Sequence, residues 1–417
     1  MRPNYIVFDF DGTIMESAPG ITGCVRHALV TLGFPEPDEA TLLKFIGPPL
    51  HPAFCEFTHL TEAQADEALK VYRERYAAAG LFEARVYPGI APLLRALKAD
   101  GRYLAIASSK PEALVKRIAA HFGLDGYFDR IIGAHPDSHS ADKRSLILSA
   151  LPENANPAEV CVVGDRCFDI DAGRALQMHT IAVEYGYGNR AEFLNSGAEA
   201  IAESAAALGE LLEAPKLRGK MISFEGSDGC GKSTQIRLLA EYLTARGEIV
   251  NLSREPGGCP ISERIREIIL SLDSKGMSAE CEALLYAAAR VEHVKETILP
   301  ALQRGEIVLC DRYLDSSFAY QASGRELGDE FVRQINKAAS DLAQPDRTLL
   351  FDISRETARK RMAGGAPLDR LEIEKEDFFR RVAERFDRLA RENPDRIRRI
   401  DSGRSIEEVF RDVIENI

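Results

Sequence analysis

Two stretches decide the fold: YIVFDFDGT, residues Tyr5–Thr13, and MISFEGSDGCGKST, residues Met221–Thr234. Each begins with a short apolar run, continues into a polar turn that contains glycine, and leads into a segment with helical periodicity. A short apolar run bounded by a turn is typical of a strand buried in a parallel sheet, and the following helix returns the chain to the other end of that sheet. The two stretches therefore predict two α/β domains.

Further strand-like runs follow each of these stretches. They lie at 103–109, 160–165 and 180–185 after the first stretch, and at 248–256, 306–313, 347–354 and 397–402 after the second. Between the two groups, Pro215 and Gly219 interrupt the pattern and indicate a linker. We expect two tandem parallel-sheet domains, 1–215 and 216–417, each with three layers because helices cover both faces of its sheet.

One segment breaks this alternation. Residues 16–87 have helical periodicity and no convincing strand pattern, which predicts a helical insertion in the first domain. Residues 198–213, rich in Ala and Glu, predict the last helix of that domain.

Composition excludes several classes of protein. The 417 residues are 45% hydrophobic and 28% charged, with a net charge of −12, which argues against nucleic acid or an anionic membrane as a partner. No apolar run approaches the roughly 18 residues of a membrane helix, and no secretory signal pattern opens the chain. The eight cysteines form no C-x-x-C pair and the histidines no metal-ligand spacing. We therefore expect a cytoplasmic protein with buried, reduced thiols that form neither disulfides nor a zinc site.

The first stretch ends in two carboxylates, Asp9 and Asp11. At the carboxyl end of a parallel strand they face the crevice where ligands bind, and such a pair can share a hard cation or divide nucleophilic attack and proton transfer. Other polar residues follow later strands or lie in loops that could reach the same edge: Ser108, Lys143, Asp165 and Asp169. This order of polar residues therefore predicts a single ligand site at that edge of the sheet.

These residues match, in order, the four motifs of the haloacid dehalogenase-like phosphatases, and residues 5 to about 212 resemble that superfamily. The resemblance implies a Rossmann-like domain in which Asp9 is the nucleophile and forms an aspartyl-phosphate, while Asp11 protonates the leaving oxygen and then activates water. It implies that Ser108 and Lys143 hold the phosphoryl group, and that Mg²⁺ is bound by Asp9, Asp165 and the carbonyl of Asp11, with Asp169 supporting the metal.

Four further segments resemble the branch of phosphoglycolate phosphatases and 5′-nucleotidases: 45–50, 86–90, 108–111 and 185–188. In that branch a helical cap occupies the position of the 16–87 insertion and closes over a small phosphomonoester.

The second stretch contains G-x-x-x-x-G-K-[ST] between a strand and a helix. In this context the backbone N–H groups of the loop surround nucleotide phosphates, Lys232 adds a positive charge, and the Ser233 hydroxyl can bind Mg²⁺. The loop is predicted to hold nucleotide phosphates through Gly226, Ser227, Asp228, Gly229, Cys230, Gly231, Lys232, Ser233 and Thr234, but the loop alone does not distinguish a kinase from a GTPase or a motor.

Downstream segments resemble bacterial thymidylate kinase over essentially all of 220–417. They are SREPGG (253–258), SERIREIIL (262–270), LLYAAAR (284–290), CDRYLDSSFAYQ (310–321) and PLDRLE (367–372). The resemblance implies a P-loop nucleoside monophosphate kinase fold with ATP, bound at 226–234, as the phosphoryl donor. It also implies a homodimer formed through this domain, and Asp311 beside Ser233 at the metal. It implies a dTMP site made by Asp228, Glu255, Arg266, Tyr286, Arg290, Arg312, Ser316, Tyr320 and Gln321.

The P-loop has no Arg or Lys between its first glycine and Gly231, so a further cation has to come from elsewhere. The cationic, Gly-rich segment 359–372 resembles the lid of the bacterial kinases, which implies that Arg361 or Arg370 acts on the transferring phosphoryl group; the alternative is a solvated helix face at 359–361.

We expect a bifunctional enzyme, a Mg²⁺-dependent phosphatase joined to a dTMP kinase. Three alternatives stay open: a kinase with a non-catalytic regulatory phosphatase-like domain, a kinase for another nucleoside monophosphate, and a nucleotide sensor without turnover.

Overall fold

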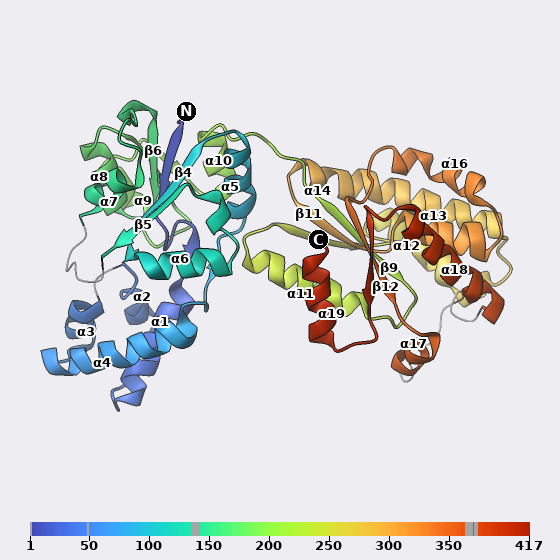
Figure 1. The fold of residues 1–417 in the computed structure, drawn as a ribbon, viewed down its shortest axis with the longest axis horizontal. Helices are drawn as coiled ribbons and strands as arrows, with labels where there is room; N and C mark the ends of the chain where they lie inside the picture. The colour runs from blue at the N-terminus through green and yellow to red at the C-terminus, as the bar shows by residue number, and fades with distance from the viewer. Residues whose placement is uncertain (1, 48–49, 136–141, 363–369, 371–373) are drawn as a thin grey trace. The chain divides into compact units, whose positions relative to one another are not determined.

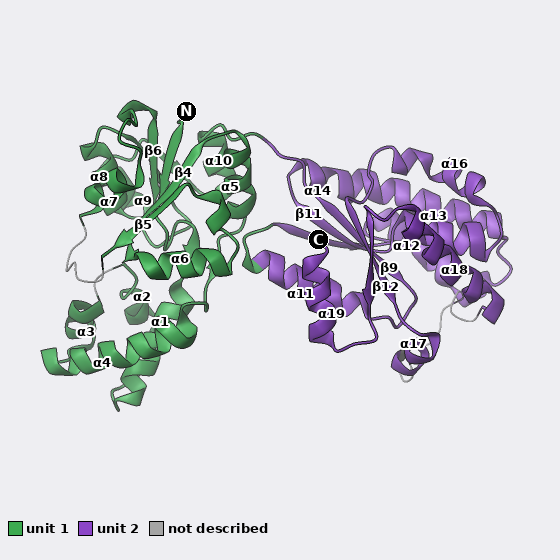
Figure 2. Ribbon diagram, in the orientation of Figure 1, with its two compact units in different colours: residues 1–215, 245–248 green, residues 216–244, 249–417 purple. Residues whose placement is uncertain are grey.

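The chain divides into two compact units, which are described separately. In the computed structural model, unit 1 holds residues 1–215 and 245–248, and unit 2 holds residues 216–244 and 249–417 (Figure 2). The structure describes residues 2–47, 50–135, 142–362, 370 and 374–417. Within these ranges, no helix has both the length and the apolar character needed to cross a membrane.

Unit 1 is built on a parallel sheet with the strand order β5-β4-β1-β6-β7-β8 (Figure 1). The strands are β1 (Tyr5–Phe8), β4 (Tyr103–Pro111), β5 (Arg130–Ala134), β6 (Val160–Gly164), β7 (His179–Val183) and β8 (Ala200–Ala202). The helices and helical turns are α1 (Ala18–Thr31), α2 (Glu39–Leu43), α3 (Leu50–Thr58), α4 (Glu62–Arg75), η1 (Tyr76–Gly80), α5 (Ile90–Ala99), α6 (Glu112–His121), η2 (Asp125–Tyr127), α7 (Lys143–Ala150), η3 (Pro157–Glu159), α8 (Cys167–Ala175), α9 (Arg190–Ser196) and α10 (Ala205–Leu211).

The central strand β1 shows why unit 1 has three layers. Ile6 and Phe8 point to one face and share a core with α5 and α10, while Val7 points to the other face and packs with α7 and α8. Successive residues of a strand face opposite sides, so an unbroken apolar run is stable only when helices cover both faces.

The helical insertion lies between two very short strands. β2 (Met15–Glu16) and β3 (Arg85–Val86) pair antiparallel at its two ends, where the sequence pattern predicts no strand. A second difference lies at 198–213, which is predicted as one helix but contains β8 before α10. Two or three residues are too few to give a strand periodicity, so sheet pairing rather than local pattern determines these strands.

Unit 2 also has a parallel sheet, with the order β10-β11-β9-β12-β13. Its strands are β9 (Met221–Gly226), β10 (Val250–Arg254), β11 (Ile307–Asp311), β12 (Arg347–Asp352) and β13 (Ile397–Asp401). Its helices and helical turns are α11 (Lys232–Ala245), α12 (Pro260–Leu270), η4 (Leu272–Ser274), α13 (Ala279–His293), η5 (Val294–Ile298), α14 (Leu299–Gln303), α15 (Leu314–Ser317), η6 (Phe318–Gly324), α16 (Asp329–Ser340), α17 (Arg355–Met362), α18 (Glu376–Glu392) and α19 (Ile406–Glu415).

Helices cover both faces of this sheet as well. Ile222 and Phe224 of β9 share a core with α11 and α19, whereas Met221 packs with η5 and α14 on the other face. The predicted fold class, two α/β domains with parallel sheets, is confirmed.

Candidate active sites

The first candidate site lies where three neighbouring strands of unit 1 end. Asp9 and Asp11 follow β1, Ser108 lies near the end of β4, and Asp165 follows β6. The backbone N–H of Asp9 still donates to the carbonyl of Val163 at 2.8 Å, which fixes the start of the loop against β6. Because these strands are parallel, their carboxyl ends meet at one edge of the sheet.

Two helices bring further charges to this edge. Lys143, the first residue of α7, places its Nζ 2.7 Å from Asp9 Oδ1 and 2.6 Å from an oxygen of Asp169, which lies on α8. Carboxylate oxygens of Asp9, Asp165 and Asp169 all lie within 4.8 Å of one another. The structure therefore brings all six predicted residues of this site to one edge.

Burial and mutual repulsion make these carboxylates costly to ionise. Desolvation raises the pKa of Asp9 to about 7, with Asp169 and Asp11 acting in the same direction and Lys143 opposing them. Burial, followed by the charges of Asp9 and Asp169, also raises the pKa of Asp165. One lysine does not balance three close carboxylates, so the donor set fits a hard divalent cation such as Mg²⁺.

The loop after β1 has to approach Asp165 closely. Gly12 has a φ of +85°, and a Cβ atom there would lie 2.1 Å from Asp165 Oδ2. Only glycine satisfies both conditions. The same oxygen, Asp165 Oδ2, accepts a hydrogen bond from the backbone N–H of Tyr187 at 2.8 Å.

Lys110 is a residue of this site that the sequence reasoning did not assign. Its Nζ donates to both carboxylate oxygens of Asp11, at 2.8 and 2.9 Å, and its backbone N–H donates to Ser108 Oγ at 3.2 Å. Burial lowers the pKa of Lys110, but the charges and hydrogen bonds of Asp11 and Tyr76 together outweigh this, and the net direction is upward. The available signal was the segment 108–111, SSKP, which places the lysine two residues after Ser108.

The second candidate site surrounds the loop between β9 and α11. Lys232 folds back over this loop, so that its Nζ donates to the carbonyls of Gly226 at 3.1 Å and Ser227 at 2.9 Å. Gly226, Gly229 and Gly231 all have positive φ values, the backbone geometry that allows a loop to turn its N–H groups inward.

A cavity of about 440 Å³ opens at this loop. Five cationic side chains and three carboxylates line it, so it suits a polyanion whose charge is partly shared with a cation. The lining residues are Asp228, Gly229, Gly231, Lys232, Ser233, Thr234, Arg254, Glu255, Arg266, Asp311, Arg312 and Arg361. Arg254 was not assigned from the sequence, although it lies within the segment 253–258 that carries part of the resemblance.

Asp311 and Ser233 provide the oxygen atoms for a cation in this cavity. Ser233 Oγ lies 3.4 Å from Asp311 Oδ2, and Asp311 Oδ1 is buried without a hydrogen-bond partner among the described residues. A buried carboxylate oxygen without a donor is unfavourable unless a cation satisfies it, so this pair also fits Mg²⁺.

A smaller cavity of about 100 Å³ is lined by four residues that also line the first: Asp228, Glu255, Arg266 and Arg312. The nine residues predicted for dTMP all line it: Asp228, Glu255, Arg266, Tyr286, Arg290, Arg312, Ser316, Tyr320 and Gln321. The end that both cavities share carries Arg266 and Arg312 and suits an anion, and the end with Tyr286 and Tyr320 suits a planar ring.

Arg312 lies where the two cavities meet. Its guanidinium donates to Gly226 O at 3.0 Å and to Asp228 Oδ1 at 2.6 Å, and stacks over the Tyr320 ring at 5.2 Å. Its φ of 67° lies in the left-handed region, which is uncommon for a residue other than glycine and is found where the surrounding structure imposes it.

Two of the predicted base contacts already have polar partners. Arg290 is buried and donates to Glu255 at 2.7 Å and to Ser317 at 2.9 Å. Gln321 donates to Glu282 at 3.1 Å. These networks fix both side chains at the wall of the smaller cavity.

The two candidate lid arginines lie in different places. Arg361, on α17, lines the larger cavity and donates to Ser402 O at 3.0 Å. Arg370 is 5% exposed, donates to Ile269 O at 2.9 Å and pairs with Glu282 at 2.7 Å, and is not among the residues that line the cavity. Residues 363–369 and 371–372 of the predicted lid lie outside the described residues.

Comparisons with known proteins assign a family to each unit. Residues 224–413 match the thymidylate kinase family, and residues 6–183 match the haloacid dehalogenase-like hydrolase family. A thymidylate kinase from Symbiobacterium thermophilum is 47% identical over 192 residues, which are 46% of this chain and 89% of the relative.

Two solved structures match unit 1. A predicted phosphatase from Clostridium acetobutylicum is 37% identical, with 51% of this chain and 100% of that chain covered and a TM-score of 0.47. A haloacid dehalogenase-like family hydrolase from Streptococcus pneumoniae is 31% identical, with 50% and 98% covered and a TM-score of 0.47. Both predicted resemblances are confirmed, and the chain belongs to the haloacid dehalogenase-like hydrolases through its first half and to the thymidylate kinases through its second.

Proposed function

We propose that unit 2 transfers the γ-phosphoryl group of ATP to dTMP and forms dTDP and ADP. The observation that carries this proposal is the joined pair of cavities, one at the phosphate-binding loop and one lined by the nine residues predicted for dTMP. In this assignment ATP phosphates lie at 226–234, and the phosphate of dTMP lies between Arg266 and Arg312.

The proposed chemistry needs positioning more than a base. An oxygen of the dTMP phosphate attacks the γ-phosphorus, the bond to the bridging oxygen of ADP breaks, and no proton has to be removed because the acceptor is already ionised. Lys232, Arg312 and Arg361 stabilise the charge on the transferring group. Mg²⁺ held by Ser233 and Asp311 would supply further charge neutralisation.

We also propose that unit 1 hydrolyses a small phosphomonoester. The Asp9 carboxylate attacks phosphorus and forms an aspartyl-phosphate, while Asp11 gives a proton to the departing oxygen. Asp11 then takes a proton from the water that attacks this intermediate, which releases phosphate and restores Asp9. Ser108 and Lys143 hold the phosphoryl oxygens, and Mg²⁺ between Asp9, Asp165 and the carbonyl of Asp11, supported by Asp169, would screen the negative charges.

A chromatographic assay tests the proposed kinase. The intact protein with Mg²⁺, ATP and dTMP is expected to form dTDP. Lys232→Ala is expected to lower kcat/KM for this reaction by about 10²–10³-fold. Lys220→Ala, at an exposed position, is the matched control and should leave kcat/KM unchanged. Absence of dTDP would refute the dTMP assignment and leave a nucleotide sensor or a kinase for another monophosphate. Greater turnover of dUMP, CMP or AMP would favour the latter.

The phosphatase is tested on a panel of phosphomonoesters with Asp9→Asn, and Asp171→Asn, an exposed residue of α8, is the control. Loss of hydrolysis in Asp9→Asn alone supports catalysis by unit 1. Hydrolysis that is equal in all three proteins would instead support a non-catalytic, regulatory unit 1.

We further propose a cytoplasmic homodimer formed through unit 2. Ile261 and Ile268 on α12 and Leu284 on α13 are each about half exposed, which is a large apolar surface for two helices to leave in water. Sedimentation of the full chain is expected to give a dimer that Ile268→Asp weakens and Ile406→Asp, on α19, does not. A monomeric wild-type chain at micromolar concentration would refute the dimer.

A further inference from the structure

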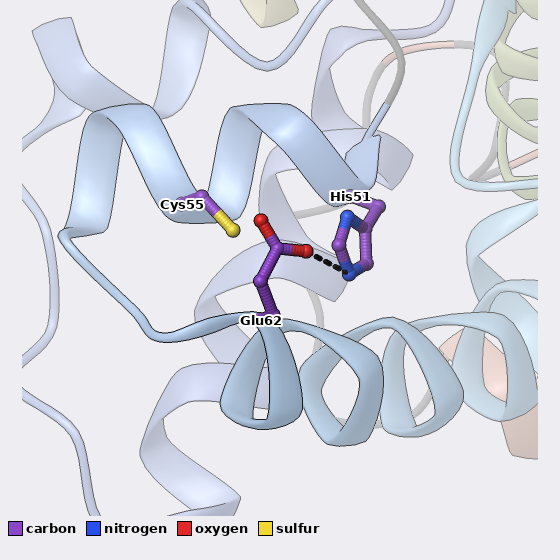
Figure 3. Close-up of side chains that lie close together, drawn as sticks. All are labelled: His51, Cys55 and Glu62. Carbon is purple, nitrogen blue, oxygen red and sulfur yellow. Dashed lines mark ion pairs between the residues drawn. The ribbon is translucent and has the colours of Figure 1, made fainter.

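The helical insertion of unit 1 holds a cluster of metal-binding side chains far from the carboxylates of the active site in sequence. His51 and Cys55 are four residues apart on α3, so they project from the same face of that helix. Glu62 and Asp66 have the same spacing on α4 and project toward them. Figure 3 shows the His51 ring, the Cys55 sulfur and the Glu62 carboxylate converging between the two helices.

The distances within this cluster suit a small coordination sphere. His51 Nε2 lies 3.2 Å from Asp66 Oδ1 and 3.6 Å from Glu62 Oε2, and donor atoms of His51, Cys55 and Glu62 all lie within 4.8 Å of one another. Ligands of a tetrahedral zinc ion are separated by about 3.3–3.8 Å, as bonds of about 2.0–2.3 Å require. His51 and Cys55 are partly exposed and Glu62 and Asp66 are exposed, so these side chains have room to adjust.

The donor types select the class of metal. A thiolate and an imidazole favour Zn²⁺ and similar ions over Mg²⁺ or Ca²⁺, which prefer sites made only of oxygen. Without a cation, the thiolate form of Cys55 is disfavoured, since desolvation and then the charges of Glu62 and Asp66 raise its pKa. A bound divalent ion removes that repulsion and holds the thiol as thiolate.

We propose that His51, Cys55, Glu62 and Asp66 form a site for Zn²⁺ or a similar borderline divalent ion that links α3 to α4. The sequence predicts no metal-ligand spacing among the histidines; in the proposed site the partners of His51 are instead a cysteine and two carboxylates, and the two carboxylates lie on the next helix. The site is partly exposed, so a metal ion can reach it from solvent.

Titration of the chelator-treated, desalted full-length chain with Co²⁺ tests this site. Cobalt bound to Cys55 gives a thiolate-to-metal charge-transfer absorption, whereas cobalt bound at the oxygen-only cluster of Asp9, Asp165 and Asp169 does not. We expect one equivalent of sulfur-bound cobalt that Zn²⁺ displaces. Cys55→Ser should abolish the absorption, and His51→Ala should weaken binding at least about tenfold.

Cys281→Ser is the matched control, because Cys281 is an exposed cysteine of unit 2 outside this cluster. An absorption that survives Cys55→Ser, or none in the wild type, overturns the proposal. A second measurement does not depend on the variants folding. Zn²⁺ should slow alkylation of Cys55 in the wild-type chain at least about tenfold, measured by peptide mass spectrometry, while alkylation of Cys281 stays unchanged. Equal alkylation of Cys55 with and without Zn²⁺ also refutes the site.

Discussion

At the scale of single residues, Lys110 holds Asp11, the proposed proton donor of unit 1, in place. Its side chain is 9% exposed, and its Nζ lies 2.8 Å from one oxygen and 2.9 Å from the other oxygen of Asp11. In the proposed reaction Lys110 contacts Asp11 and not the substrate, so it is a positioning residue. We expect Lys110→Met to lower kcat of the phosphatase by about 10–100-fold and to change KM much less.

Lys110→Arg, which keeps the charge, should restore part of kcat. Lys116→Met, at an exposed position on α6, should leave both parameters unchanged. Steady-state kinetics on any hydrolysed phosphomonoester provide the measurement. An increase in KM with normal kcat would show that Lys110 binds substrate instead.

We expect the protonation of Asp9 to make the proposed binding of Mg²⁺ depend on pH. Burial raises the pKa of Asp9 to about 7 in the metal-free protein, so the folded chain holds a proton there that the unfolded chain loses near pH 4. Between about pH 4 and pH 7 the unfolded chain has lost this proton and the metal-free folded chain still holds it. The metal-free fold therefore becomes less stable as pH rises through this range, and bound Mg²⁺ should remove that loss. Below about pH 7 the ion has to displace the proton, and its affinity should fall by up to about tenfold per pH unit.

Titration calorimetry of the nucleotide-free protein measures this affinity between about pH 5 and pH 8. Asp9→Asn cannot ionise at that position and should bind Mg²⁺ weakly with a smaller dependence on pH. Equal affinity of the wild type across this range would contradict the raised pKa of Asp9.

Residue identity was easier to predict than residue pairing. The sequence named Asp9, Asp165 and Asp169 because each lies at or near the end of an apolar run, and parallel strands bring such ends together. It did not identify Lys110, whose importance depends on where its Nζ lies relative to Asp11. The sequence also did not distinguish Arg361 from Arg370. Only the tertiary packing places Arg361 in the cavity wall and Arg370 against Glu282.

At the scale of helices and strands, a close contact between glycines joins α1 to η1. A Cβ atom added at Gly20 would lie 2.1 Å from the carbonyl oxygen of Gly80. Gly20→Ala should therefore push the two segments apart and destabilise unit 1 by about 1–3 kcal/mol, the usual cost of overpacking. Thermal unfolding measures this loss, and dTDP formation by unit 2 should be unaffected.

Gly126→Ala is the matched control, because nothing lies within 4 Å of a Cβ atom added there. Equal stability of the two variants would mean that α1 and η1 can separate without cost.

Long elements were predicted well and short ones poorly. Strands such as β6 and β11 lie in sheets that helices cover on both faces, so nearly every residue of these strands is apolar. Such continuous apolar runs can be identified from the sequence alone. β2, β3 and β8 have two or three residues, and β5 is half-exposed along most of its length. Such strands form because a partner strand is present, and no hydrophobic periodicity in the sequence predicts them.

At the scale of the whole molecule, each unit has hydrophobic cores of its own. Those of unit 1 gather around Ile6, Val7 and Ile170, and those of unit 2 around Phe224, Met221 and Phe386. Each of these cores contains residues of one unit only. A unit with its own core can unfold cooperatively by itself, so we expect two thermal transitions in the full chain.

Ligands should then move the two transitions separately. A ligand at about 100 times its Kd stabilises the state that binds it by about 2.7 kcal/mol, which corresponds to a rise in Tm of roughly 5–10 °C for a unit of this size. A non-hydrolysable ATP analogue with dTMP and Mg²⁺ should raise only the transition of unit 2, and Lys232→Ala should greatly reduce that rise. Mg²⁺ with a phosphate mimic should raise only the transition of unit 1, and Asp9→Asn should reduce it. Scanning calorimetry of the full chain records both transitions at once; a single transition that either ligand moves as a whole would show that the two units unfold together.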